Sequence, residues 1–285
     1  MKIRKIGILF HPKVEATISK AHEVELFLKR NGVQVWLCSA WEPRQIYSSI
    51  NGTDLIVTIG GDGTILRAFH AIGDAVVPIV GINLGKLGFL AEIDADSAES
   101  ELEKLLEGNS WIDERAMLSA ELLPVKGKSQ QFYALNDVSA GRGEILRLVK
   151  IEVSINNRSF TTYNADAVVI ATATGSTGYA LAAGGPILYP ESKDLVIVPV
   201  APHLSMPYPL ILPGTSEISL TINTYHAASL SVDGHDNMLL HDGDKIIVKL
   251  SQRVARFLRI HPRENFFISL EGKLNGKQHS SGRKG

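Results

Sequence analysis

The chain has 285 residues, with 29 Lys and Arg against 30 Asp and Glu. This length can bury one large core or two of ordinary size, and the pattern described below favours two domains. Because the charges balance and no basic run occurs inside the body of the chain, the composition argues against a nucleic-acid-binding protein.

Residues 1–112 alternate between short apolar segments and helical patterns, which is typical of a parallel sheet covered by helices. The first helix is expected to bury Ala21, Val24 and Leu28 and to end at Asn31-Gly32, because glycine favours a helix C-terminus. These elements predict an N-terminal Rossmann-like α/β domain. The expected strands lie at residues 5–10, 33–38, 55–59 and 78–82, and a further helix is expected at residues 97–107.

After Trp111 the pattern changes to short β-rich segments separated by turn residues, which predicts a C-terminal β-rich, sandwich-like domain over residues 113–257. One helix is expected within it near residues 178–184. We expect residues 258–274 to pack back on the N-terminal domain and residues 275–285 to form a flexible tail. The expected strands lie at residues 116–125, 131–135, 149–155, 159–163, 167–171, 195–199, 217–222, 228–232 and 245–250.

Cysteine content and hydropathy predict a cytoplasmic protein. The single cysteine, Cys38, cannot form an internal disulfide and is expected to be a buried, inert thiol in a reducing compartment. The first apolar stretch ends after five residues at His11-Pro12, which is too short for the core of a signal peptide. No other run approaches the length of a membrane span, so we expect no membrane partner.

The most informative motif is Gly60-Gly61-Asp62-Gly63-Thr64, which joins an apolar strand to a helix. Glycines let the backbone approach a ligand, and the start of a helix offers N–H groups to an anion, so a phosphate is expected here. A carboxylate in such a loop repels phosphate unless it holds a metal ion or receives a proton from a hydroxyl that is being phosphorylated. The motif therefore indicates phosphoryl transfer. The simpler alternative is a turn in which Asp62 caps the helix.

Three further segments carry candidate site residues. A second glycine loop, residues 81–89, follows the next strand, where open α/β sheets place ligands, although a structural role is its simpler interpretation. The segment from Thr174 to Tyr179 has more hydroxyls than capping requires, which favours a polar pocket with the Tyr179 ring available for stacking. The pair Asn136-Asp137 ends a strand and offers groups for sugar hydroxyls, although such pairs are also common in turns.

Several well-known motifs are absent from the sequence. No lysine completes a Walker loop, no Gly-x-Gly-x-x-Gly follows the first strand, and the nine histidines show no spacing typical of a zinc site. The chain is therefore not expected to be a Walker-type NTPase, a dehydrogenase with a standard dinucleotide loop, or a zinc protein.

Taken together and in this order, the motifs resemble the NAD kinase family, over most of the chain from Gly60 to about Asp233. The resemblance implies a two-domain kinase, working as a homodimer or homotetramer. It would transfer the terminal phosphoryl group of ATP, or of polyphosphate, to the 2′-hydroxyl of the adenosine ribose of NAD, giving NADP. No metal ligand from the protein is implied, and Mg²⁺ would arrive with the phosphates of the donor.

The resemblance also implies roles for individual residues. Asp62 would be the catalytic residue, as general base or orienter of the 2′-hydroxyl, and Asn136 and Asp137 would bind ribose hydroxyls. The implied NAD-binding residues are Gly63, Phe89, Asn136, Asp137, Asp166, Thr174, Ser176, Thr177, Gly178 and Tyr179, of which Phe89, Asp166, Thr177 and Tyr179 would line the adenine site. The implied donor-loop residues are Gly60, Gly61, Gly63, Thr64 and Arg67.

Several positions depart from the family pattern. Asp137 stands where Glu is usual, Gly178 where Ala is usual and Ala173 where Pro is usual. Residues 208–213 lack the Arg of an Arg-Pro-Ile-type segment. The missing Arg leaves the choice between ATP and polyphosphate open.

Two other functions remain open at this point. A lipid or sugar kinase would share the Gly-Gly-Asp-Gly loop, but the Gly-Thr-x-Asn-Asp-Phe-Ala-Arg segment of lipid kinases is absent, and sugar kinases are not expected to contain residues like 174–179. A nucleotide-binding sensor without turnover would keep the pocket, and the intact Asp62 argues against it.

Overall fold

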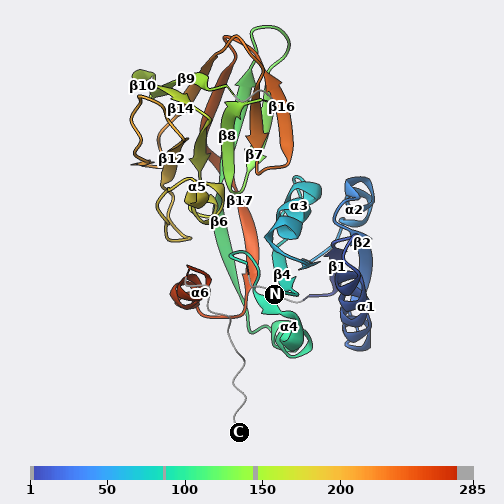
Figure 1. The fold of residues 1–285 in the computed structure, drawn as a ribbon. Coiled ribbons are helices and arrows are strands. Elements are labelled where there is room, and N and C mark those ends of the chain that lie inside the picture. Colours follow the sequence, from blue (N-terminus) through green and yellow to red (C-terminus); the bar gives the residue numbers. More distant parts are fainter. Residues whose placement is uncertain (1–2, 86–87, 144–146, 275–285) are drawn as a thin grey trace. The chain divides into compact units, whose positions relative to one another are not determined.

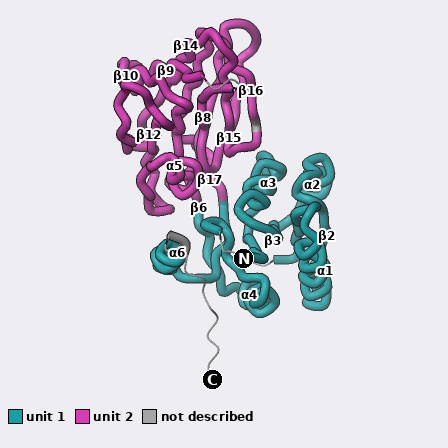
Figure 2. Tube along the Cα trace, viewed as in Figure 1, with its two compact units in different colours: residues 1–113, 256–285 teal, residues 114–255 magenta. Residues whose placement is uncertain are grey.

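A computed structural model describes residues 3–85, 88–143 and 147–274 of the chain. The chain divides into two compact units: unit 1 comprises residues 1–113 and 256–285, and unit 2 comprises residues 114–255 (Figure 2). In sequence terms, unit 2 is therefore inserted into unit 1. The chain passes from one unit to the other within two strands, β6 (Trp111–Leu123) and β17 (Lys245–Arg259).

Unit 1 is built on a parallel sheet with helices (Figure 1). Its elements are β1 (Lys5–Phe10), α1 (Glu15–Arg30), β2 (Gln34–Ser39), α2 (Pro43–Ser49), β3 (Leu55–Ile59), α3 (Asp62–Ile72), β4 (Ile79–Asn83), β5 (Ile93–Asp94), the 3-10 turn η1 (Ala95–Ser97), α4 (Ala98–Leu106) and α6 (Asn265–Leu274). The strand order is β2-β1-β3-β4, and all of these neighbours are parallel. The end of β17 joins the sheet in parallel beside β4, through Phe257 opposite Ile79.

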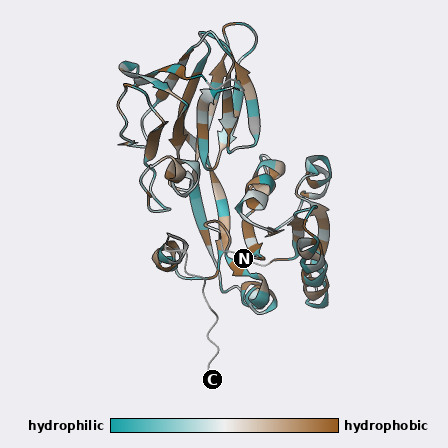
Figure 3. Ribbon diagram, in the orientation of Figure 1, coloured by the Kyte–Doolittle hydropathy of each residue, from teal (hydrophilic) through white to brown (hydrophobic). Residues whose placement is uncertain are grey.

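Helix α1 shows how the local sequence produces these elements. Thr17, Ala21, Val24 and Leu28 are buried on one face at helical spacing, and the chain leaves the helix where Gly32 adopts a φ of 76°. Full burial of one Leu or Val side chain contributes about 1.5–3 kcal/mol. The apolar stripe and the helix end predicted from the sequence are confirmed. In Figure 3 the helices of unit 1 carry both hydrophobic and hydrophilic residues, as helices on the surface of a sheet do.

The strand order of unit 1 fixes where a ligand is expected. The connection from β1 leads to β2 on one side, whereas β3 lies on the other side of β1. In open α/β sheets, ligands bind beyond the carboxyl ends of the strands at such a reversal. The glycine loop of residues 60–64 follows β3 directly, and His11 follows β1, so both lie at this edge.

Unit 2 contains antiparallel strands in two sheets. One sheet has the order β13-β12-β11-β8-β15-β16. The strands of unit 2 in the other sheet have the order β10-β9-β14-β17, with β6 paired to β17 and β7 paired to β6. The elements, besides β6 and β17, are β7 (Gln130–Ala134), β8 (Asp137–Arg142), β9 (Val149–Ile155), β10 (Arg158–Ala165), β11 (Ala167–Ala171), η2 (Gly175–Thr177), α5 (Tyr179–Ala182), β12 (Leu195–Val200), β13 (Leu210–Leu212), β14 (Ile218–Asn223), β15 (Ala228–Val232) and β16 (Asp236–Leu240).

Strand β11 explains the continuous apolar run of residues 167–171. Val168 and Ile170 belong to the core shared by strands of both sheets, whereas Val169 and Ala171 pack on the opposite face with Ala180 of α5. Because successive side chains of a strand point to opposite faces, a strand buried on both faces needs no polar alternation. The predicted fold class, a parallel α/β domain followed by a β-rich domain, is confirmed.

Some elements differ from the sequence prediction. The polar and small residues of β8 hide its strand pattern, and β13 and β16 are also absent from the predicted set. Strand β17 continues to Arg259, beyond the expected end at residue 250. Within residues 258–274, the first two residues end β17 and Asn265–Leu274 form helix α6, whereas the tail expected at residues 275–285 lies outside the described residues.

Two observations bear on features expected of the whole chain. Cys38 is a buried free thiol, and its burial, together with the nearby charge of Glu42, raises its pKa to about 11, so the reactive thiolate is disfavoured. Within the described ranges, none of the helices combines the length and apolar character that a membrane crossing requires.

Candidate active site

The first glycine loop opens helix α3. Asp62 is its first residue and Gly61 is the N-cap, and no described side chain caps this helix end. Gly61 and Gly63 are exposed, and a Cβ placed on either would meet no atom within 4 Å. The loop therefore presents an open backbone at a helix N-terminus, which is the arrangement that binds phosphate.

The carboxylate of Asp62 is bound by the second glycine loop rather than by its own helix. Its Oδ2 accepts the N–H of Phe89 at 2.8 Å, and its Oδ1 accepts the N–H of Leu90 at 3.1 Å. A Cβ at Gly88 would lie 2.0 Å from Asp62 Oδ1, so only glycine allows this close approach. Asp62 therefore does not merely cap the helix. Residues 88–90 of the second glycine loop bind and orient its carboxylate.

The remaining donor-loop residues differ in their surroundings. Thr64 is buried, whereas the guanidinium of Arg67 lies 4.4 Å from the ring centroid of Trp41. The ring of Trp41 also meets that of His11 edge-on at 4.3 Å. Arg67 is thus held over an aromatic face at the ligand edge of the sheet, a favourable place for a cation.

Asn83, the last residue of β4, is a candidate that the sequence analysis did not single out. Its side chain is 4% exposed, and within the described part of the chain its Nδ2 has no hydrogen-bond partner. A buried donor without a partner is costly, and it is satisfied when a ligand supplies an oxygen. Only its place at the end of a central strand could have indicated it from the sequence.

In unit 2, the pair Asn136-Asp137 is held by Asp233. One oxygen of Asp233 accepts the N–H groups of Asn136 and Asp137 at 2.7 and 3.0 Å, and the other accepts the N–H of Leu135 at 2.8 Å. The Oδ1 of Asn136 is buried and, among the residues described, has no partner. The chain turns at Asp233-Gly234, and the carboxylate of Asp233 also positions this pair.

Asp137 is 7% exposed and lies beside the charge of Asp233. Burial, followed by this neighbouring charge, raises the pKa of Asp137 to about 7. At neutral pH its carboxyl group therefore exists in both protonation states, so it can donate a hydrogen bond to a hydroxyl oxygen or accept one from a hydroxyl.

The hydroxyl-rich segment is organised by its own backbone. Thr172 donates to the carbonyl of Leu135 at 2.6 Å, and Ser176, which is fully buried, donates to Ala173 and accepts from the N–H of Leu188. A Cβ at Gly175 would lie 2.0 Å from the carbonyl oxygen of Asn136, so the loop can pack on Asn136 only with glycine there. These hydroxyls fix the shape of the loop.

A hollow of about 250 Å³ in unit 2 collects other predicted residues. Asp166 forms an ion pair with Arg142 at 3.1 Å at this site, and Tyr179 is 46% exposed, which leaves ring surface available for stacking. The residues that line the hollow are Ser139, Gly141, Arg142, Asp166, Ala167, Tyr179, Val200 and Ser229.

Two arginines of unit 2 contact predicted site residues, although neither was singled out from the sequence. Arg142 pairs with Asp166, as above, and Arg115 of β6 is 8% exposed and donates to the hydroxyl of Thr174 at 3.4 Å. Their positions in strands, rather than in a glycine loop, gave no signal in the sequence.

The predicted residues thus fall into two groups. Unit 1 contains residues 60–64, Arg67 and Phe89, of which Asp62 and Phe89 are hydrogen-bonded. Unit 2 contains the remaining residues, where the 172–179 segment packs on Asn136 while Asp166 and Tyr179 share the hollow.

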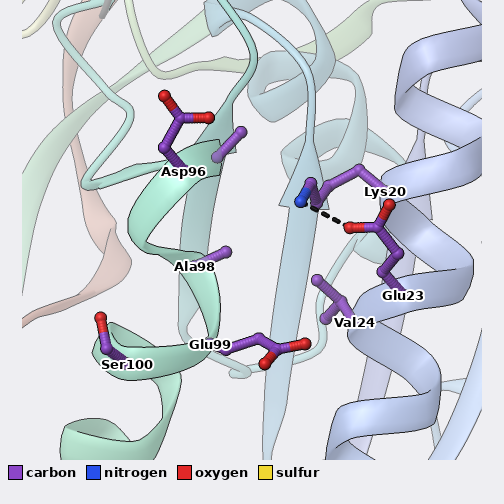
Figure 4. A pocket seen from close by; sticks show the side chains of 8 residues that line it. Lys20, Glu23, Val24, Asp96, Ala98, Glu99 and Ser100 are labelled. Atoms are coloured by element: carbon purple, nitrogen blue, oxygen red, sulfur yellow. Dashed lines mark hydrogen bonds and ion pairs between the residues drawn. The ribbon is translucent and has the colours of Figure 1, made fainter.

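A larger hollow of about 300 Å³ in unit 1 contains none of the predicted residues. It lies beside α1 and the start of α4 (Figure 4). Its lysine, Lys20, is already paired with Glu23 at 2.6 Å, and Asp96 and Glu99 add negative charge. This hollow has no feature that favours a phosphate ligand.

Comparisons with known proteins agree with these two groups of residues. The family model of the ATP-NAD kinase N-terminal domain matches residues 40–110, and that of the ATP-NAD kinase C-terminal domain matches residues 135–260. An NAD kinase of Dehalococcoides mccartyi is 44% identical over 97% of this chain and 98% of its own.

Two solved structures are similar over nearly the full length. The crystal structure of yeast NADH kinase complexed with NADH has a TM-score of 0.87 at 26% identity, and covers 100% of this chain and 91% of that chain. An NAD kinase from Archaeoglobus fulgidus in complex with ATP has a TM-score of 0.77 at 25% identity, and covers 96% of this chain and 100% of that chain.

Proposed function

The chain belongs to the NAD kinase family, and we propose that it transfers the terminal phosphoryl group of ATP to the 2′-hydroxyl of the adenosine ribose of NAD, giving NADP. The observation that carries this proposal is Asp62, a carboxylate oriented by two N–H groups at the start of an uncapped helix. The lipid-kinase, sugar-kinase and sensor alternatives are not favoured, because the family match covers both parts of the chain.

Residues of unit 2 are proposed to bind the acceptor. The amide of Asn136 and the carboxyl group of Asp137 bind ribose hydroxyls, since Asn136 has an unpaired buried oxygen, within the part of the chain that is described, and Asp137 can donate or accept. Asp166 and Tyr179, which line the same hollow, bind the adenine, and the ring of Tyr179 stacks on the base. Thr174 and Thr177 contribute hydroxyls, while Ser176, Gly175 and Gly178 shape the loop.

Asp62 is proposed to accept the proton of the 2′-hydroxyl. Phosphoryl transfer through a loose transition state requires positioning and charge neutralisation more than a strong base, so a carboxylate suffices. The oxygen of the 2′-hydroxyl forms a bond to the terminal phosphorus of ATP, the bond from that phosphorus to the bridging oxygen breaks, and ADP leaves. The N–H groups of residues 61–63 at the start of α3 and the guanidinium of Arg67 offset the charge of the donor phosphates, whereas the N–H groups of Gly60 and Thr64 donate to backbone carbonyls.

Mg²⁺ is proposed to enter with the donor. The described residues contain no group of three or more His, Cys, Asp or Glu side chains that could hold a metal ion. The substrate is then the magnesium complex of ATP, in which the phosphates supply the ligands. Polyphosphate, which presents the same phosphate chemistry, is the alternative donor.

We also propose a division of labour between two domains. Residues 1–112, with residues 258–274, form the donor-binding domain, and residues 113–257 form the NAD-binding domain. The protein works in the cytoplasm, where a free thiol such as Cys38 stays reduced, and as a homodimer or homotetramer.

The experiment that tests the function measures NADP formation from NAD and Mg²⁺ with either ATP or polyphosphate, coupled to an NADP-specific dehydrogenase. The parent chain should form NADP with ATP. Asp62→Asn should lower kcat by about 100- to 10,000-fold, because general base assistance is removed, with the Kd for NAD changed by less than about threefold.

Binding measurements separate this function from its rival. If the parent chain forms no NADP with either donor while calorimetry shows NAD binding, the protein is a sensor and the kinase proposal is wrong. NADH replaces NAD in a parallel reaction, which determines the acceptor.

A further inference from the structure

The direction of the Asp62 carboxylate depends on two consecutive peptide groups, those that carry the N–H of Phe89 and of Leu90. A carboxylate oxygen can accept more than one hydrogen bond, so both oxygens keep capacity for a substrate hydroxyl. A shift of the backbone at residues 89–90 would turn the carboxylate away from the direction in which it meets that hydroxyl.

The peptide backbone of Leu90 is bound on its other side by Arg259, the last residue of β17. A terminal N–H group of Arg259 donates to the Leu90 carbonyl at 2.9 Å and to Glu92 Oε2 at 3.1 Å. Its Nε donates to Asp113 Oδ2 at 3.0 Å. Arg259 is 6% exposed, so one buried guanidinium connects Leu90 to two buried carboxylates.

Glu92 forms a second connection between the same two segments. Its Oε1 accepts the N–H groups of Ile260 and His261 at 2.8 and 2.9 Å and lies 2.9 Å from Nδ1 of His261. The N–H of Glu92 in turn donates to the carbonyl of Gly81 at 3.0 Å. Residues 90–92 are therefore fixed both to the end of β17 and to the central strand β4.

We propose that Arg259 is a positioning residue for phosphoryl transfer, which sets the direction of the Asp62 carboxylate through Leu90. Leu90 donates to Asp62 and accepts from Arg259, so a single residue joins the two side chains. The inference rests on the proposed function. Replacing Arg259 should therefore lower kcat, because a displacement of about 1 Å at the reacting groups can reduce the rate about 100-fold.

A purely structural role is the alternative. Arg259 would then only bind the end of β17 to residues 90–113 of the same unit. Its loss would destabilise the fold, because the carboxylates of Glu92 and Asp113 would stay buried without this cation. The two roles differ in one respect. If Arg259 acts through Asp62, replacing Arg259 no longer changes the rate once Asp62 is replaced. If Arg259 only stabilises the fold, its replacement lowers the rate equally with and without Asp62.

The test is a double-mutant cycle with Asp62→Asn, Arg259→Met and the double variant, in which kcat and the KM for NAD are measured. Arg259→Met should lower kcat by about 10- to 100-fold and change the KM by less than about threefold. In the Asp62→Asn background the same substitution should lower kcat by less than about threefold. Equal losses in both backgrounds would overturn the proposal.

A second measurement does not depend on activity. Hydrogen exchange of the Phe89 and Leu90 amides should become faster in Arg259→Met than in the parent, beyond any change in the rest of unit 1. This readout applies even if the parent chain phosphorylates no NAD, so the inference and the proposed function fail separately. Unchanged exchange at these two amides would contradict the inference.

Two further variants complete the design. Leu258→Ala removes a neighbouring side chain that is 2% exposed and belongs to the core of unit 1, so it destabilises the unit without removing a bond to Leu90. It should leave kcat per folded molecule within about twofold of the parent. If Arg259→Met does not fold, Arg259→Lys takes its place in the cycle, because lysine keeps the charge but lacks the planar fork that binds three oxygens.

Discussion

Asp137 and Asp233 are neighbouring aspartates in different surroundings. Asp233 accepts three backbone N–H groups, whereas Asp137 is buried next to the negative charge of Asp233. Burial and this charge therefore oppose ionisation of Asp137, and its pKa is raised from 3.8 to about 7. The carboxyl group of Asp137, which is proposed to bind a ribose hydroxyl, therefore changes charge near neutral pH.

The raised pKa predicts a dependence of stability on pH. An acid whose pKa is higher in the folded state stabilises the fold at low pH, and this contribution is lost as the pH rises from about 4 to about 7. The full shift corresponds to roughly 4 kcal/mol as an upper estimate. Asp137→Asn should remove this slope and make the protein more stable than the parent at pH 8, as measured by urea denaturation at pH 5 to 8.

The matched control is Asp194→Asn, which changes an exposed aspartate of the same unit. This variant leaves Asp137 in place, so the loss of stability that Asp137 causes between pH 5 and 8 should remain. An Asp137→Asn protein that keeps the parent's slope would show that Asp137 does not titrate in this range.

At the scale of elements, the site depends on how one loop packs on the backbone of another. The carbonyl of Asn136 accepts the N–H of Thr172 at 2.9 Å, and Gly175 packs directly on the same carbonyl. The loop from β11 to α5 therefore fixes the position of Asn136 through main-chain contacts. A side chain at Gly175 would separate the two loops.

Gly175→Ala is predicted to weaken NAD binding. Its Cβ would lie 2.0 Å from a backbone oxygen, so the loop must shift, and the KM for NAD should rise by at least about 10-fold, with a loss of about 1–3 kcal/mol in the free energy of unfolding. Gly178→Ala is the matched control, because its Cβ would find its nearest neighbour at 3.4 Å, an ordinary van der Waals distance. A similar KM for both variants would contradict this account.

At the scale of the whole molecule, the sequence predicts the fold class and the two candidate groups because both depend on local signals. Apolar alternation, Asn31-Gly32 and the glycine loops all lie in contiguous segments. What it misses depends on pairing over long distances. The partners of Asp62 and Asn136 lie 27 and 97 residues away, and the strand β8 is recognisable only beside its partners β11 and β15.

The division of the chain predicts different effects for two truncations. Ending the chain after residue 255 removes Leu258 from the core of unit 1 and Arg259 from Asp113 and Glu92, so residues 1–113 should lose their protection from hydrogen exchange. Ending it after residue 274 removes only residues outside the described ranges and should change that protection little. A protected 1–113 segment in the shorter chain would contradict the prediction.

The insertion of unit 2 into unit 1 also has a consequence for biosynthesis. Residues 1–113 leave the ribosome first, but Arg259 follows only after the whole of unit 2 has been made. At about 5–20 residues per second, this delay is roughly 7 to 30 seconds. During this interval the nascent chain already contains Asp62 but has no partner for the Leu90 carbonyl from β17. The carboxylate of Asp62 is therefore expected to take its final direction only when translation is nearly complete.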